Sequence, residues 1–174
     1  MSKKIEKEVS EILFRYSFNR APIPVEKIAL KMNLAVMPTD LGPGVSGALI
    51  IKDGIATIGV NQSESRVRRR FTVAHELGHF ILHNSDNNLF VDKGSQILFR
   101  NEGSSYGVLQ REKEANAFAA ALLMPEGMIK SEIESALNGE SVENDEELIG
   151  LLSKRFDVSE ISMTYRLSNL GLLH

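Results

Sequence analysis

Two histidines separated by three residues, with a glutamate directly after the first, form the segment of this chain best suited to chemistry. The residues are His75, Glu76 and His79, within Phe71-Thr-Val-Ala-His-Glu-Leu-Gly-His-Phe-Ile-Leu82. Residues four apart lie on one face of an α-helix, so both imidazoles can reach one metal ion while Glu76 lies beside it. Zinc with three protein ligands keeps an open position and lowers the pKa of its bound water to about 7. The pattern predicts a hydrolytic zinc site in which Glu76 is the catalytic base.

The third zinc ligand must come from elsewhere in the chain. His83 lies on the same helix face, but its Cα would be about 12 Å from that of His75, too far for joint coordination. The metzincin pattern requires glycine at position 82 and histidine at position 85, where this chain has Leu82 and Ser85. A glutamate on a second, downstream helix is the arrangement that remains. The acidic residues available after the motif are Asp86, Asp92, Glu102, Glu112 and Glu114.

The stretch from Gln110 to Met124 predicts the second helix. Its apolar residues recur at helical spacing, its alanines allow close helix packing, and Pro125 ends it. Glu114 stands at the edge of the apolar face, whereas Glu112 lies nearer the start of the helix, where a solvated charge beside the helix dipole is the alternative. The pattern favours Glu114 slightly over Glu112.

Gly78, between the two motif histidines, costs about 1 kcal/mol relative to alanine inside a helix. We therefore expect another backbone to pass close beside it. Asn61 and Glu64 resemble a capping box, which predicts that the helix begins there. The structural alternative is a buried helix whose histidines pair with carboxylates without a metal.

The wider pattern predicts an α+β fold, mostly helical with a small antiparallel sheet or hairpin before the motif helix. Asp53-Gly54 between two β-rich runs is typical of a hairpin turn, because that turn needs positive φ values. We expect a single domain over residues 1–174, with a C-terminal helix pair at 147–170 packed on it. Ser159 is expected to cap the second helix of that pair. Helices are predicted at 5–16, 25–32, 147–156 and 159–170, and strands at 34–37, 46–51 and 55–61.

Composition narrows the classes of function. The 174 residues carry 20 basic and 23 acidic side chains, and this net charge of -3 argues against a whole-surface attraction to nucleic acid. The absence of cysteine excludes a thiolate nucleophile and a cysteine zinc site. The start of the chain has no apolar signal core, and the longest apolar run, 117–124, is far shorter than the roughly 20 residues that span a bilayer. We expect a cytoplasmic protein that does not enter the membrane.

Two separated motifs together resemble the ImmA/IrrE family of bacterial metallopeptidases, and the likeness extends to the preceding hairpin and the C-terminal tail. The motifs are Arg70-Phe-Thr-Val-Ala-His-Glu-Leu-Gly-His79 and Glu112-Lys-Glu-Ala-Asn-Ala-Phe-Ala-Ala-Ala-Leu-Leu-Met-Pro125. The resemblance implies a gluzincin-like fold and one zinc ion, bound by both histidines and by the glutamate directly before Ala-Asn. It also implies site-specific cleavage of a helix-turn-helix repressor that controls a mobile element, prophage or toxin-antitoxin locus. Carried over to this chain, the ligands are His75, His79 and Glu114, and the base is Glu76.

Two other classes of function stay open. One is a binding module that sequesters a regulator without cutting it. The other is a DNA-binding regulator that uses the C-terminal helix pair with Arg155 and Arg166, although this pair lacks a basic recognition face. A basic cluster before the motif is expected to be a solvated face or a docking patch for an acidic partner. The cluster comprises Arg66, Arg68, Arg69 and Arg70, and the candidate oxyanion donors are Tyr106 and Tyr165.

Overall fold

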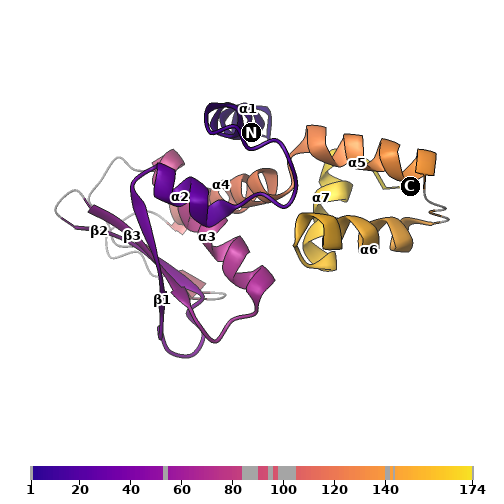
Figure 1. The fold of residues 1–174 in the computed structure, drawn as a ribbon. Coiled ribbons are helices and arrows are strands. Elements are labelled where there is room, and N and C mark those ends of the chain that lie inside the picture. Colours follow the sequence, from indigo (N-terminus) through magenta and orange to yellow (C-terminus); the bar gives the residue numbers. More distant parts are fainter. Residues whose placement is uncertain are drawn as a thin grey trace.

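The sheet lies at one end of the computed structural model, which describes residues 2–52, 55–83, 90–93, 96–97, 105–139, 142 and 144–173 (Figure 1). Its strands are β1 (Leu34–Thr39), β2 (Gly47–Lys52), β3 (Ile55–Asn61), β4 (Phe90–Lys93) and β5 (Gln96–Ile97). Their order across the sheet is β1-β3-β2-β4-β5. β1 runs parallel to β3, and the other described pairs are antiparallel.

The predicted hairpin is confirmed, while the sheet around it differs from the prediction. Lys52 pairs with Ile55, so only two residues join β2 to β3; those two residues themselves lie outside the described part of the chain. The β2–β3 hairpin is antiparallel as expected, and β1 adds to the free edge of β3 in the parallel direction, so the whole sheet is mixed. Nothing in the alternation of a single strand specifies which neighbour it will pair with.

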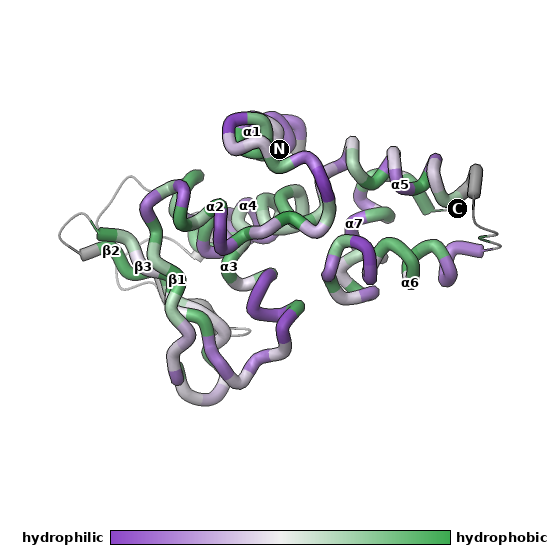
Figure 2. Tube along the Cα trace, viewed as in Figure 1, coloured by the Kyte–Doolittle hydropathy of each residue, from purple (hydrophilic) through white to green (hydrophobic). Residues whose placement is uncertain are grey.

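The helices surround one apolar core. They are α1 (Ser2–Arg15), α2 (Val25–Lys31), α3 (Arg66–His83), α4 (Ser105–Leu123), α5 (Glu126–Gly139), α6 (Asp145–Phe156) and α7 (Glu160–Leu170). α3 carries the histidine motif and packs against α4 on one side and against β2 and β3 on another. Figure 2 shows the first turns of α3 as hydrophilic and β2 and β3 as mainly hydrophobic. Among the described residues, no helix has the length and apolar character needed to cross a membrane.

Two helix boundaries depend on caps. The capping box at Asn61 was wrong: its side chain accepts from the backbone N–H of Ser63 (3.1 Å) and donates to the carbonyl of Val45 (2.8 Å). α3 begins at Arg66, where the hydroxyl of Ser65 accepts from a backbone N–H of the first turn. The predicted cap of α7 is confirmed, since Ser159 accepts from the N–H of Ser162 (3.2 Å). α5 had no sequence prediction.

α3 and α4 touch at the glycine of the motif. A Cβ at Gly78 would lie 3.1 Å from both the Cα and the carbonyl oxygen of Ala115, and 3.2 Å from the Cβ of Phe118. The expected close backbone is therefore that of α4. This contact brings Glu112, three residues before Ala115, to the level of the two motif histidines.

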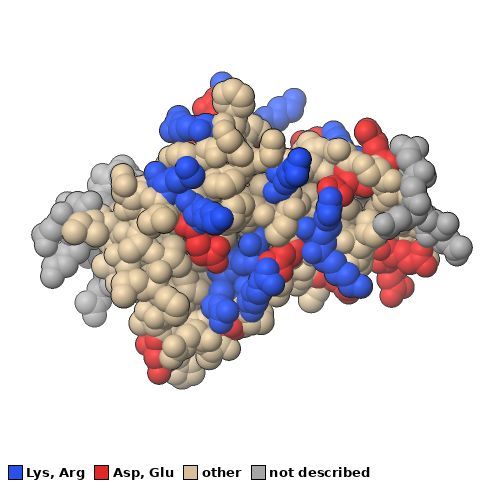
Figure 3. All heavy atoms as spheres, in the orientation of Figure 1, with Lys and Arg blue, Asp and Glu red and all other residues tan. Residues whose placement is uncertain are grey.

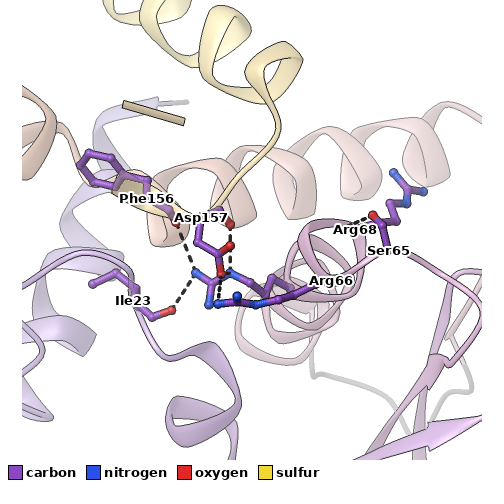
Figure 4. A network of polar contacts seen from close by, with 7 residues as sticks. Ile23, Ser65, Arg66, Arg68, Phe156 and Asp157 are labelled. Carbon is purple, nitrogen blue, oxygen red and sulfur yellow. Dashed lines mark hydrogen bonds and ion pairs between the residues drawn. The ribbon is translucent and has the colours of Figure 1, made fainter. Parts of the chain in front are cut away.

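The C-terminal helices are attached to both of these central helices, and Figure 4 shows the contacts at the start of α3. At the turn between α6 and α7, Asp157 lies 2.7 Å from the guanidinium of Arg66 and 3.0 Å from that of Arg70. Arg70 also donates to the carbonyl of Ile23 (3.0 Å). On α7, Arg166 pairs with Glu6 through two hydrogen bonds of 2.7 and 3.1 Å, and donates to the carbonyl at the end of α4. The helix pair therefore holds the start of α3 and the end of α4.

Removing the charge of Asp157 is expected to destabilise the protein. Burial lowers the pKa of Arg70 and the charge of Asp157 is the largest effect that opposes this, so Asp157→Asn leaves a buried guanidinium without its nearest counter-ion. We expect the free energy of unfolding of the metal-free protein, measured in urea, to fall by about 2 kcal/mol. The control is Glu132→Gln, which breaks the exposed pair with Arg155 and costs less than about 1 kcal/mol. Equal losses in the two variants contradict this account.

Candidate metal centre

Two imidazoles and one carboxylate converge between α3 and α4. The Nε2 atoms of His75 and His79 are 3.0 Å apart, and the carboxylate oxygens of Glu112 lie 3.3 Å from the first and 2.9 Å from the second. Ligand atoms about 2.1 Å from a tetrahedral zinc ion lie about 3.4 Å from one another. The three side chains therefore fit a zinc ion with only small shifts.

The two histidines are buried and Glu112 is mostly buried, and the carboxylate is negatively charged, which favours binding of a cation. His75 and His79 are 3% and 2% exposed, and the side chain of Glu112 is 12% exposed. Burial by itself raises the pKa of Glu112, but hydrogen bonds from the two histidines outweigh it and lower the pKa to about 2. At neutral pH this carboxylate is an anion, which is the form that binds metals.

The structure corrects the choice of Glu114 as third ligand. The carboxylate of Glu114 lies 3.6 Å from Nε2 of His83 and accepts from the side chain of Gln110 (2.8 Å), while Glu112 takes the place beside the motif histidines. Residues two apart on a helix point about 200° away from each other, so only one of the two glutamates can reach the point between His75 and His79. The contact of Ala115 with α3 decides which one, because residues three apart share a face.

A signal for Glu112 was present in the sequence. Glu112, Ala115 and Ala119 recur at the spacing of one helix face, and both alanines are fully buried. Apolar residues of α4 also lie on both sides of the row formed by these three residues. For this reason the sequence analysis placed the edge of the apolar face too near Glu114. Adjacency to the Ala-Asn pair, the basis of the family carry-over, selected the glutamate that lies outside this cluster.

The sequence analysis missed Asn116, whose side chain contacts one of the candidate ligands. Its Oδ1 lies 3.1 Å from Nδ1 of His75. An amide oxygen only accepts hydrogen bonds, so Nδ1 of His75 donates to it, and Nε2 is the ring nitrogen that lies beside Glu112 and His79. Asn116 follows Glu112 by four residues, and one face of α4 therefore supplies both a candidate ligand and a group that contacts a second candidate ligand.

Asn116→Ala is expected to weaken zinc binding about tenfold, because outer hydrogen bonds to a ligating histidine commonly have effects of this size. Competition with a chromophoric chelator at neutral pH measures it. The matched control is Asn116→Asp, which keeps an acceptor for His75 and should retain the affinity. Equal loss in both variants would assign Asn116 to helix stability alone.

Glu76 follows the first ligand on α3 and is 1% exposed. Its carboxylate faces the start of β2, where a Cβ placed on Gly47 would lie 3.3 Å from Oε1. His83 lies outside the cluster: its Nε2 is 3.3 Å from the carbonyl of Arg111, and burial lowers its pKa and keeps it neutral. Tyr165 is 70% exposed on α7. The side chains of Tyr106, Asp86, Asp92 and Glu102 lie outside the described residues.

The side chains of the basic cluster before the motif differ in their exposure to solvent. Arg70 is 6% exposed, whereas the side chain of Arg66 is 72% exposed. Arg68 donates to the hydroxyl of Ser46 (3.1 Å), and Arg69 donates to the carbonyl of Glu64 (3.2 Å). Figure 3 shows Lys and Arg gathered near the start of α3 and the end of α6, with acidic side chains between them. For Arg70, the expectation of a solvated or docking role was wrong.

The fold and the buried His-His-Glu cluster define a metallopeptidase-like domain, with both histidines on one helix and the glutamate on a second. The chain belongs to the Peptidase_M78 family, the IrrE N-terminal-like domain, which it matches over residues 29–168. The predicted relation to the ImmA/IrrE family is confirmed, as is the α+β fold.

The chain is also similar to two known proteins, one in sequence and one in structure. It is 29% identical over 103 residues to "Uncharacterized immunity region protein 2" of Bacillus phage phi105, an alignment that covers 59% of this chain and 60% of the relative. The solved structure of a Mycobacterium tuberculosis transcriptional regulator matches with a TM-score of 0.67 and 16% identity, and covers 95% of this chain. At that identity the likeness concerns the fold alone. The chain spans 46% of the regulator and thus less than two thirds of either protein.

Proposed function

We propose that this protein is a zinc-dependent metalloendopeptidase that cleaves a helix-turn-helix transcriptional repressor at one site. The observation that carries the proposal is the convergence of His75, His79 and Glu112 on one point, with Glu76 next to the first ligand. Membership in a peptidase family supports the choice of zinc over other divalent ions. One ion is expected, held by these three side chains.

The reaction is hydrolysis of a peptide bond. A zinc ion held by His75, His79 and Glu112 would supply a Lewis acid for the scissile carbonyl and would lower the pKa of a bound water molecule to about 7. Glu76 accepts a proton from the attacking water and transfers it to the nitrogen of the leaving amine. Asn116 keeps His75 in the tautomer that ligates, and Glu112 contributes the negative charge of the ligand set.

The proposed substrate class is supported by the relative from Bacillus phage phi105, which is named as a protein of an immunity region. A repressor of this kind acts on DNA in the cytoplasm, which is therefore the proposed place of action. We also propose that residues 1–174 act as one domain, since one core cluster includes residues from α1 to α7.

The test is to mix the zinc-loaded protein with the repressor encoded beside its gene. Mass spectrometry should identify two fragments from a single cut, and Glu76→Gln should leave the repressor intact. A stable complex without fragments, for wild type and variant alike, favours sequestration and overturns the peptidase. A salt-dependent shift of DNA by the protein alone favours the regulator. The burial of Arg166 in its pair with Glu6 weighs against that last outcome.

A further inference from the structure

The first residue of β2 approaches α3 more closely than any side chain allows. A Cβ built on Gly47 would overlap with Cγ2 of Thr72, and would lie 3.3 Å from both Oε1 of Glu76 and the carbonyl oxygen of Gly59. Thr72 and Glu76 are one helical turn apart and each is 1% exposed. The strand therefore packs its bare backbone against the part of α3 that carries the proposed base.

The strand cannot move away to make room for a side chain. Just before β2, the backbone N–H of Asn61 donates to the carbonyl of Ser46 (2.9 Å), and its side chain donates to the carbonyl of Val45 (2.8 Å). The hydroxyl of Ser46 donates to the carboxylate of Glu64 (3.1 Å) and accepts from the guanidinium of Arg68 (3.1 Å). These bonds hold the entry to β2 from three sides, and β3 pairs along its whole length.

α3 is held just as firmly on its other sides. The backbone of Ala115 touches Gly78, so α4 blocks a shift away from the sheet. Arg70 is bonded to Asp157 and to the carbonyl of Ile23, which blocks a slide along the helix axis. An added methyl group at the start of β2 can then be accommodated only by displacing the side chains it meets.

Building on the proposed function, we infer that Gly47 is a positioning residue for Glu76. Its lack of a side chain lets β2 support α3 directly and holds the carboxylate at the point from which it accepts the proton of the attacking water. Two glycines thus set the two halves of the site: Gly78 admits the helix that brings Glu112, and Gly47 admits the strand that holds Glu76.

The experiment compares a double variant with a reference and a control. The added methyl group of Gly47→Ala would meet both Cγ2 of Thr72 and the carboxylate of Glu76, so this single change cannot separate the two effects. The double variant Gly47→Ala/Thr72→Ser removes the overlapping Cγ2 atom and leaves only the contact with Glu76. The Oγ1 atom of Thr72 makes no hydrogen bond in the described part of the chain, so serine at this position breaks none. Thr72→Ser alone is the reference. Gly59→Ala is the matched control in the neighbouring strand, because a Cβ there would meet nothing closer than 3.8 Å.

For the double variant we expect a melting temperature within a few degrees of the Thr72→Ser reference. Zinc affinity should be unchanged, and kcat should be at least about tenfold lower with little change in KM, as for a misplaced catalytic group. Gly59→Ala should match wild type in every measurement. A kcat equal to that of the reference overturns the inference, because Gly47 would then serve packing alone.

A second readout does not depend on activity. In the metal-free protein at constant pH, the carboxyl carbon resonance of Glu76, assigned with Glu76→Gln, should move in the double variant and stay in place in Gly59→Ala. If it does not move, the inference is overturned. If it moves while the wild-type protein cleaves no repressor, the proposed function fails and the positioning of the carboxylate by Gly47 stands.

Discussion

Glu112→Gln is expected to lower zinc affinity by more than about a hundredfold, since it removes the one anionic ligand from the site. Glu114→Gln, two residues away on the same helix, should bind zinc within about threefold of wild type, an effect no larger than that of distant changes. The reason lies in the distances: the carboxylate of Glu112 reaches both motif imidazoles, and that of Glu114 is bonded to Gln110.

The measurement is competition for zinc with a chromophoric chelator at neutral pH, with metal stoichiometry determined on the dialysed proteins. Circular dichroism of each metal-free variant checks that the helices remain. The reverse order of affinities, with Glu114→Gln the weaker, would restore the original sequence prediction and contradict the arrangement of α4 described above.

Glu76→Gln is expected to lower kcat by about a thousandfold, within the range observed when a general acid-base group is removed. Glutamine keeps the size and the hydrogen-bonding reach of the side chain but cannot accept the proton. Because Glu76 is not one of the converging ligands, zinc should remain bound with wild-type stoichiometry.

Cleavage of the repressor, followed by the appearance of fragments over time, measures this effect. The control is Glu114→Gln, which also replaces a carboxylate by an amide but lies outside the cluster, and it should retain the wild-type rate. A Glu76 variant that loses zinc together with activity would make this residue a ligand, and one that cleaves at the wild-type rate would remove it from the reaction.

The C-terminal helix pair shows how a sequence motif can change its meaning in the tertiary structure. The turn between α6 and α7 resembles that of a DNA-binding unit, yet Arg166 is buried against Glu6 and the end of α4. At the turn, Asp157 binds the first residues of α3. In this protein the pair stabilises the two helices that carry the proposed ligands.

Local features of the chain determined the parts of this protein that depend on one helix or one hairpin. The periodicity of an α-helix is sufficient to place His75 and His79 together, and a two-residue connection is sufficient to pair β2 with β3. The glycine within the motif likewise indicated a close neighbour, because its cost inside a helix needs a compensating contact.

Only the tertiary structure decided which residues meet across elements. The third ligand depends on the rotation of α4 about its own axis, which the contact of Gly78 with Ala115 sets. The parallel pairing of β1 and the burial of Arg70 likewise arise from contacts between distant segments. Helical periodicity relates residues a few positions apart, whereas the relative orientation of two helices follows from side-chain packing at their interface, and the spacing within either helix does not contain that information.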